Sequence, residues 1–397
     1  MKNLLIVFLL LNSTFCKADH WTKKSNFPGG PRNDAYGFSI GNKGYVGGGI
    51  DTLGNIKPDF WEYDPYTDAW IQKTNTPFQA TSGGTFTIGN KAYYCFLDPI
   101  YSVNDLWEYD PINDSWIQKA NFPGSLRFSL VAFVIGSIAY AGAGYNGGSY
   151  LSDFYSYDTS TNSWVGISNL PNISGPASAF TVNYKAYVTG TWDSSQFLAS
   201  PHVFEYNPLS NSWSQKTNFP DTPRTDATAL SISNTGYFGI GDPGSGGHFK
   251  DWWQYNPLSD SWIKKASIPC TFGKDENASF ELNNKGYICF GSDVHLNSEL
   301  WEYTPDSTSD VQEINNRIVS VQVFPNPFLT TTTITFSKEL DNAEMILSDI
   351  YGKKIAAYKN ISGAECLLHR NNLSSGIYFY CIKENGLIVA KNKIVVQ

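Results

Sequence analysis

The 397-residue sequence contains no stretch of 18 apolar residues, which is about the least that a membrane-spanning helix needs. It also lacks clusters of lysine and arginine, and its formal net charge is −8. A chain without a basic surface has little attraction for phosphate backbones or anionic lipid. These absences exclude a transmembrane span and argue against nucleic acid as a partner.

Cysteine is scarce, with six residues and no Cys-x-x-Cys spacing, so the sequence offers no zinc motif. Five cysteines remain after residues 1–18, and this odd number excludes a simple disulfide framework. Cys366 and Cys381 lie on two expected strands, and the sequence leaves open whether they pair. The five histidines are dispersed without the spacing of a shared site. We therefore expect no metal and no cofactor.

Residues 1–18 carry Lys2, an apolar run over residues 4–11 and a small residue at Ala18. This pattern is typical of a secretory signal peptide cleaved near Ala18, and the alternative is an ordinary buried strand. Cys16 is not preceded by the small residues that lipid attachment requires. Removal of residues 1–18, with Lys2 and Lys17, makes the net charge −10.

Six tryptophans recur at spacings of 49, 46, 48, 49 and 49 residues. They are Trp21, Trp70, Trp116, Trp164, Trp213 and Trp262. Each repeat also has a tyrosine preceded by glycine or alanine, and a second tyrosine about 18 residues later. A fixed period near 48 residues indicates one supersecondary unit repeated around a common core.

The first unit, residues 35–73, shows what each repeat is. Four short runs rich in aromatic and β-branched residues are separated by Gly, Asn, Asp and Pro: AYGFSIG, KGYVGGG, DFWEYDP and AWIQK. Such runs predict four antiparallel strands, and no helical period competes with them. The third turn, Asp64–Asp68, has Pro and Asp where hairpin turns favour them. Repetition of this unit predicts an all-β propeller.

The repeats resemble the kelch family over about residues 20–305. The fullest copy has Arg32 before the first strand, Gly47-Gly48 ending the second, Tyr63-Asp64-Pro65 ending the third and Trp70 opening the fourth. The glycine pair is replaced by Cys95-Phe96 in the second copy. We expect Cys95, and Cys289 at the same repeat position, to be buried small hydrophobes.

The chain starts its repeats with an outer-strand pattern, Trp21–Lys24, and ends them with three strands that lack a following tryptophan. We predict that the N-terminal strand completes the last blade beside the strand ending at Tyr303. Closure of the ring removes free sheet edges. Residues 19–305 are thus expected to form a six-bladed propeller.

Residues 306–318 are polar and aperiodic and are interpreted as a linker. Residues 319–397 are expected to form a small immunoglobulin-like antiparallel sandwich. The pattern that predicts these strands comprises residues 321–328, 331–336, 345–348, 375–380 and 391–397. This segment resembles the C-terminal type A sorting domain of the type IX secretion system of Bacteroidetes. The resemblance rests on Pro325-Asn326-Pro327-Phe328, Asp349-x-x-Gly352-Lys353, Gly376-Ile377-Tyr378 and a short basic, apolar end. The alternative is an accessory module retained in the mature protein.

Charged residues recur just before the first strand of the repeats, where kelch-like topology opens on the central funnel. They are Arg32, Asp34, Arg127, Arg224, Asp226, Lys274 and Glu276. Such a ring suits a polar ligand, because fixed carboxylates and guanidinium groups hold sugar hydroxyls or acidic peptides. The alternative is that each arginine pairs with a carboxylate and braces the blades. A second recurring set, Asp59, Asp105, Asp153, Asp251 and Glu299, is expected to bond backbone groups of neighbouring loops.

Insertions that do not recur carry the aromatic residues Tyr145, Tyr150, Trp192 and Phe249. Aromatic rings in such loops suit stacking on sugars or contacts with proteins, and the alternative is that they fill turns. No catalytic residue is assigned. The sequence favours a secreted or cell-surface binding module for protein or carbohydrate, exported by the type IX machinery through residues 319–397. The alternative is a carbohydrate-active enzyme such as a sialic acid-type epimerase or mutarotase, which some six-bladed kelch proteins are.

Overall fold

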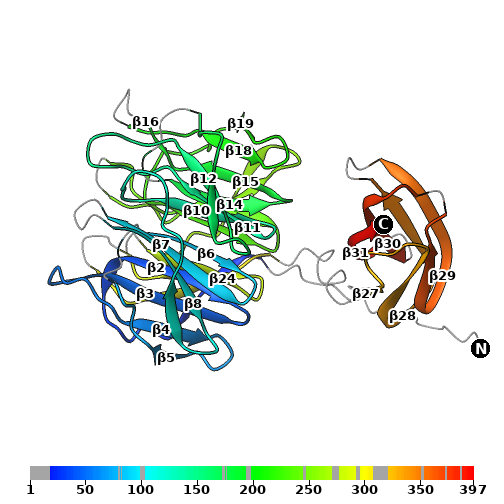
Figure 1. The fold of residues 1–397 in the computed structure, drawn as a ribbon. Coiled ribbons are helices and arrows are strands. Elements are labelled where there is room, and N and C mark those ends of the chain that lie inside the picture. Colours follow the sequence, from blue (N-terminus) through cyan, green and yellow to red (C-terminus); the bar gives the residue numbers. More distant parts are fainter. Residues whose placement is uncertain are drawn as a thin grey trace, which may run out of the picture. The chain divides into compact units, whose positions relative to one another are not determined.

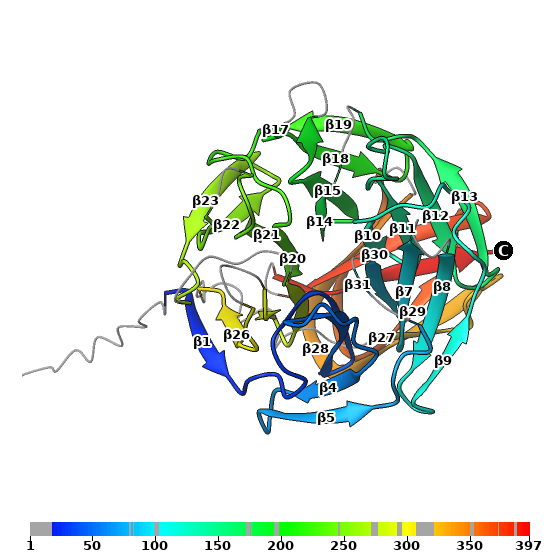
Figure 2. The same cartoon turned by 90° about the vertical axis from the view of Figure 1, so that its left-hand side faces the viewer.

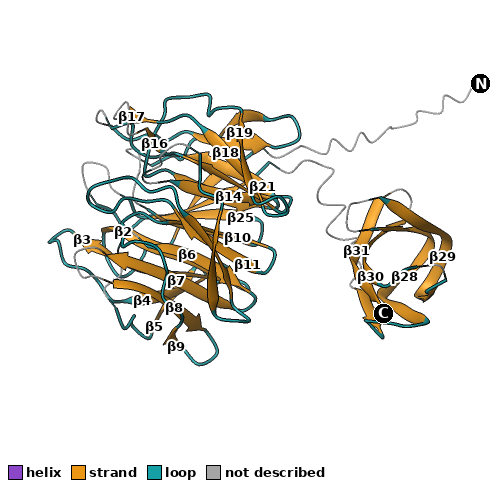
Figure 3. Cartoon of the chain, turned by 45° about the horizontal axis from the view of Figure 1, so that its top comes forward, coloured by secondary structure: helices purple, strands orange, loops and turns teal. Residues whose placement is uncertain are grey.

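The computed structural model describes residues 18–397 except 79–80, 82, 99–102, 172–174, 176, 194–197, 245–246, 271–276, 292–295, 307–320, 350–352, 372 and 385–386. The predicted signal peptide, apart from Ala18, and the predicted linker, apart from Asp306, lie outside the described residues. The described residues contain strands and loops only, as Figure 3 shows. None of them belongs to a helix with the length and apolar character needed to span a membrane.

Residues 19–305 form one compact unit of six four-stranded antiparallel sheets. The first three blades are β2 (Arg32–Ile40), β3 (Lys43–Asp51), β4 (Phe60–Asp64) and β5 (Ala69–Lys73); β6 (Gly84–Ile88), β7 (Lys91–Asp98), β8 (Val103–Asp110) and β9 (Ser115–Gln118); and β10 (Val131–Ile135), β11 (Ile138–Gly142), β12 (Phe154–Asp158) and β13 (Ser163–Ile167). The order of strands in each sheet follows the chain, as the repeat predicts.

The fourth to sixth blades follow the same plan. They are β14 (Ser178–Val182), β15 (Lys185–Thr189), β18 (Val203–Asn207) and β19 (Ser212–Lys216); β20 (Thr228–Ile232), β21 (Thr235–Gly239), β22 (Trp252–Asn256) and β23 (Ser261–Lys265); and β24 (Ala278–Leu282), β25 (Lys285–Cys289), β26 (Leu300–Thr304) and β1 (His20–Lys24). A small hairpin, β16 (Trp192–Asp193) and β17 (Leu198–Ala199), is inserted in the fourth blade. The inner strand of each blade contacts the inner strands of both neighbours, so the blades close into a ring (Figures 1 and 2).

The N-terminal strand completes the sixth blade, as predicted. β1 pairs antiparallel with β26, and Trp21 stands opposite Tyr303. The Trp21 indole packs on Tyr303 with ring centroids 5.0 Å apart and donates from Nε1 to the Ala266 carbonyl at 2.7 Å. Asp19 accepts hydrogen bonds from the Ala266 amide at 2.6 Å and the Tyr303 hydroxyl at 3.0 Å. Through Asp19 and Trp21, the N-terminal strand therefore joins the fifth and sixth blades.

The recurring tyrosine and turn residues join successive blades. Tyr109 donates its hydroxyl to Asp114 at 2.8 Å, and the same carboxylate accepts from the Thr74 amide of the preceding blade. Asp114 has a positive φ of 47°, which Asp and Asn tolerate better than most residues. Equivalent Tyr–Asp or Tyr–Asn bonds recur at Asp68, Asn162, Asn211 and Asp260. The periodicity seen in the sequence is thus the periodicity of inter-blade contacts.

Residues 321–397 form a second all-β unit with β27 (Val321–Phe324), β28 (Thr331–Ser348), β29 (Lys354–His369), β30 (Gly376–Glu384) and β31 (Leu387–Val396). The two strands expected at 331–336 and 345–348 are one bulged strand, β28, and β29 was not expected. β28 pairs with β27 in its first part, with β30 in its last part and with β29 over most of its length. The expected sandwich is therefore one continuous sheet that curls into a barrel-like shape.

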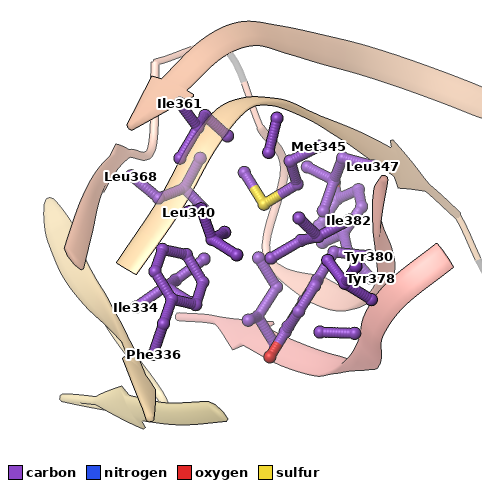
Figure 4. Packing of buried hydrophobic residues seen from close by; sticks show 14 of the residues in the cluster. Ile334, Phe336, Leu340, Met345, Leu347, Ile361, Leu368, Tyr378, Tyr380 and Ile382 are labelled. Atoms are coloured by element: carbon purple, nitrogen blue, oxygen red, sulfur yellow. The ribbon is translucent and has the colours of Figure 1, made fainter. Parts of the chain in front are cut away.

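The curled sheet encloses its own apolar core (Figure 4). Ile334, Met345, Leu368 and Ile382 are fully buried in it. A bridge from Phe328 to Val396 brings the last strand back to the segment after β27. Cys366 and Cys381 are free thiols, so they do not pair, whereas Cys95 and Cys289 are buried as expected.

Candidate functional site

The six inner strands of the propeller surround a polar pocket of about 250 Å³ on the axis of the ring. Its lining comes from β2, β6, β10, β14, β20 and β24 and from the residues just before them. Small residues such as Gly84, Ala132, Ala179 and Ala229 keep the centre open. The ring symmetry of the repeats therefore places one concave site where all blades meet, the usual location of a ligand site in a closed ring of sheets.

Two carboxylates, Asp34 and Asp226, line this pocket from the first and fifth blades. Both have a positive φ, 52° and 51°, and Ser129 at the equivalent place in the third blade has 53°. In the first blade Asp34 lies within β2, and the pairing with β3 passes over it between Asn33 and Ala35. The sequence predicted both aspartates as funnel residues, and the structure brings them to the same pocket.

Hydroxyl and amide groups complete the polar lining. Thr228 donates its hydroxyl to the Asn277 amide oxygen at 2.6 Å, and Ser178 donates to the Ala227 carbonyl. Since the Asn277 oxygen is engaged, its amide nitrogen is left to act as a donor. Among the described lining residues there are two carboxylates and no cationic side chain. The described lining is thus polar and rich in groups that bond hydroxyls.

The three recurring arginines do not line the pocket. Arg32, Arg127 and Arg224 are 0–1% exposed. Each forms an ion pair with the carboxylate that begins the third strand of its own blade: Asp59 at 2.8 Å, Asp153 at 2.6 Å and Asp251 at 2.5 Å. Each guanidinium also lies over a phenylalanine ring, at 4.7–5.0 Å from the centroids of Phe27, Phe122 and Phe219. The ion pairs lie within one blade, but the backbone amide of each phenylalanine is hydrogen-bonded to the preceding blade, at Ser298, Asn104 and Pro201. These contacts therefore match the bracing of adjacent blades.

Arg127 has the most complete set of partners. Its Nε donates to the Ser125 carbonyl at 2.8 Å, and its Nη1 donates to the Ala143 carbonyl at 3.0 Å. Two further bonds, at 2.6 and 2.8 Å, join the guanidinium to both oxygens of Asp153. Burial alone raises the pKa of Asp153, but the hydrogen bonds and charge of Arg127 outweigh burial and hold that pKa below its usual value.

The other carboxylates that begin third strands also bind side chains rather than the expected backbone groups. Asp105 accepts from Gln118 Nε2 at 2.9 Å, while Glu299 accepts from Trp301 Nε1 at 3.0 Å and pairs with Lys23 at 2.7 Å. Asp59 and Asp251 likewise accept from the indoles two residues further on, at 2.7 and 2.6 Å. The recurrence of these residues thus reflects recurring structure.

Three of the four predicted loop aromatics form one cluster. The rings of Tyr145 and Tyr150 lie 5.0 Å apart, and those of Tyr150 and Trp192 lie 6.2 Å apart. Tyr150 and Trp192 both pack on Gly175, two residues before Ala177 of the pocket lining. The indole Nε1 of Trp192 is buried, and no described residue accepts its proton. The aromatic cluster, Tyr145, Tyr150 and Trp192, therefore lies near the rim of the axial pocket.

The described lining of the pocket does not include the remaining predicted residues. Phe249 lies over the Arg224 guanidinium at 3.9 Å and covers that buried ion pair. Lys274 and Glu276 lie outside the described residues. Sequence reasoning missed Ser178, Thr228 and Asn277, because small polar residues are common at strand ends. Their position in the repeat could have identified them, because each lies at or just before the start of an inner strand.

Comparisons with known proteins agree with this architecture. Residues 127–171 match the kelch motif, and residues 322–397 match the secretion system C-terminal sorting domain. N-acetylneuraminate epimerase 2 of Escherichia coli O6:H1 is 34% identical over 85 residues, which is 20% of this chain and 23% of that protein. N-acetylneuraminate epimerases of Escherichia coli K12 and Shigella boydii serotype 4 match over the same shares at the same identity. The match thus spans about a quarter of the length of these curated relatives.

Among solved structures, the one entitled "Structure of YjhT" is similar with a TM-score of 0.57. The alignment covers 70% of this chain and 96% of that chain at 15% sequence identity, so the likeness shows a common fold. The kelch match falls on the third blade, and the sorting-domain match covers the curled sheet after the propeller. The chain is therefore a kelch-repeat β-propeller protein that carries a C-terminal sorting domain of the type IX secretion system.

Proposed function

We propose that the propeller is an exported, non-catalytic glycan-binding module whose ligand occupies the axial pocket. The single observation that carries the proposal is the polar lining, in which Asp34 and Asp226 face one cavity together with hydroxyl and amide groups. Carboxylates accept hydrogen bonds from sugar hydroxyls, and such charge-assisted bonds are stronger than neutral ones. The sorting domain at residues 322–397 supports export of the propeller to the cell surface or beyond it.

The aromatic cluster near the rim supports the same proposal. Sugar rings present a face of C–H groups that packs on aromatic side chains, while their hydroxyls require polar partners. Tyr150 and Trp192 pack beside the approach to β14, and Ala177 at that approach lines the pocket. A glycan could thus place one residue in the pocket and a second against Tyr150.

The test is a glycan array with the purified full chain, followed by titration of the best ligand. Replacing Asp34→Asn and Asp226→Asn is expected to weaken binding at least tenfold for each carboxylate, because a hydrogen bond to a charged group contributes about 1.5–3 kcal/mol. The control variant, Glu339→Gln with Glu365→Gln, makes the same change in net charge on exposed residues of the sorting domain. Unchanged affinity of the aspartate variant would contradict the proposal.

A second candidate is a sugar epimerase or mutarotase. The specific observation in its favour is that two carboxylates from different blades share one pocket, since anomer exchange needs an acid and a base on opposite sides of the ring. The partial match to proteins named N-acetylneuraminate epimerase agrees with it. Nuclear magnetic resonance of anomer exchange with neutral sugars and N-acetylneuraminate separates the candidates. Exchange accelerated by the chain, and lost in Asp34→Asn, would replace the non-catalytic proposal.

A further inference from the structure

A second cavity of about 280 Å³ lies on the axis next to the axial pocket. Because we propose that the axial pocket binds a glycan, we call it the glycan pocket below. The two share lining residues, among them Thr85, Ala132 and Ser279, so they adjoin. The glycan pocket is lined by the first residues of the inner strands, whereas the second cavity is lined as far as their last residues, such as Ser39 and Glu281. We call this second space the lower cavity.

Glu281 is the one ionisable group among the described residues that line the lower cavity. Its neighbours on the wall are apolar or carry hydroxyls, including Thr87, Thr181 and Ser231. Its side chain accepts a hydrogen bond from the Asn284 amide at 3.3 Å, which is long for a bond to a carboxylate. Burial raises the pKa of Glu281, and the Asn284 bond offsets this only in part. The cavity thus holds a carboxylate whose charge is poorly compensated.

Two hydroxyls of the wall present oxygens rather than hydrogens to the cavity. Thr85 donates its hydroxyl to the Gly37 carbonyl at 2.9 Å, and Thr87 donates to the Ser39 carbonyl at 2.9 Å. A hydroxyl has one hydrogen to donate, so these two retain only acceptor capacity toward the axis. Two such acceptors beside one carboxyl group are complementary to a ligand that is rich in donors.

The strands packed against β24, which carries Glu281, do not supply a cation to pair with this carboxyl group. β20 has no charged side chain, and Lys285 of β25 bonds Glu302 at 2.6 Å. Lys43 of β3 pairs with Asp64 at 2.7 Å, and Arg32 of β2 pairs with Asp59. Asp34, the other charged residue of β2, lines the glycan pocket and is itself anionic. In an empty cavity burial favours the neutral carboxyl of Glu281, and a cationic ligand would instead stabilise its charged form.

We propose that the lower cavity binds a small primary ammonium ion, with Glu281 as its counter-ion. An alkylammonium carries one positive charge and three donors, which one carboxylate and two or three hydroxyl oxygens satisfy. A divalent metal fits less well, because calcium takes six to eight oxygen ligands and usually several carboxylates. No cluster of potential metal ligands exists among the described residues. The two spaces adjoin, but this inference does not depend on the proposed glycan site.

The test is ligand-observed nuclear magnetic resonance of ethylammonium with the full chain. We expect saturable binding that Glu281→Gln weakens at least tenfold, because the charge-assisted bond is lost. Thr87→Val should weaken binding less, by several-fold, since one acceptor is removed and the charge stays. Ethanol and tetramethylammonium, which lack the charge or the N–H donors, should bind at least tenfold more weakly than ethylammonium.

The variants also separate this site from the proposed glycan site. Asp34→Asn with Asp226→Asn should leave ethylammonium binding unchanged, and Glu281→Gln should leave glycan binding unchanged. Absence of ethylammonium binding, equal binding by Glu281→Gln, or loss of binding in the aspartate variant alone would overturn the inference. Sodium or potassium that displaces ethylammonium at equal concentration would also overturn it, because the site would then select charge without N–H donors.

Discussion

Replacing Arg127 by alanine should destabilise the propeller by about 3–5 kcal/mol, the usual result when one partner of a buried ion pair is removed. The guanidinium is fully buried and makes hydrogen bonds to Ser125, Ala143 and Asp153. Its loss leaves the Asp153 carboxylate and two backbone carbonyls without their partners. Urea unfolding followed by tryptophan fluorescence measures the change.

Two comparisons separate bracing from ligand binding at Arg127. The double variant Arg127→Ala with Asp153→Ala should lose less stability than Arg127→Ala, because no uncompensated charge remains. Since the pKa of Asp153 is lowered in the folded state, the contribution of the pair is complete above about pH 4. It should be lost as the pH falls through that lowered pKa. A loss below 1 kcal/mol, with glycan binding abolished, would show instead that Arg127 serves the ligand.

Deleting residues 19–24 should abolish the closed ring, and this is the largest effect that we expect. The deletion removes β1, exposes the edge of β26 and takes away the bonds of Asp19 and Trp21 to Ala266. An unpaired edge promotes association between chains. Size-exclusion chromatography with light scattering should find oligomers or aggregate, and near-ultraviolet circular dichroism should find a loss of ordered tryptophan packing.

Trp21→Ala is the milder form of the same test, with an expected cost of about 3 kcal/mol for a large aromatic side chain. Trp70→Ala is the matched control. Trp70 makes the equivalent contacts, to the Ser25 carbonyl at 3.1 Å and the Tyr63 ring at 4.9 Å, on a strand that the chain already holds in its blade. A deletion variant that stays monomeric and melts at the temperature of the intact chain would contradict closure by β1.

The fold of the propeller could be predicted because its landmarks are residues of the repeated contacts. Trp21 and Tyr303 were aligned by period alone, and they stand opposite each other in the sixth blade. The strands of the sorting domain were harder to predict. β29 has no regular alternation of apolar and polar residues over Lys354–His369, so no strand pattern was visible. β28 was divided in two because polar residues and bulges interrupt its middle.

The candidate site could be predicted only in part. Asp34 and Asp226 were identified because they follow recurring arginines, and they do line the pocket. The arginines were also predicted to line the pocket, but their side chains are buried in ion pairs instead. Recurrence in the sequence identifies a position in the blade but not the direction in which its side chain points. Glu281 was overlooked because it occurs in one blade only. Glu281 lies on the axis because the six blades close into a ring. No local sequence pattern indicates how the closed ring arranges its inner strands.

The position of a bound glycan tests the central claim most directly. A crystal of the full chain soaked with the strongest ligand from the array should show density in the axial pocket, within hydrogen-bond distance of Asp34 and Asp226 and in contact with the Tyr150 side of the rim. Density confined to the outer strands or to the sorting domain, with the axial pocket empty, would contradict the account.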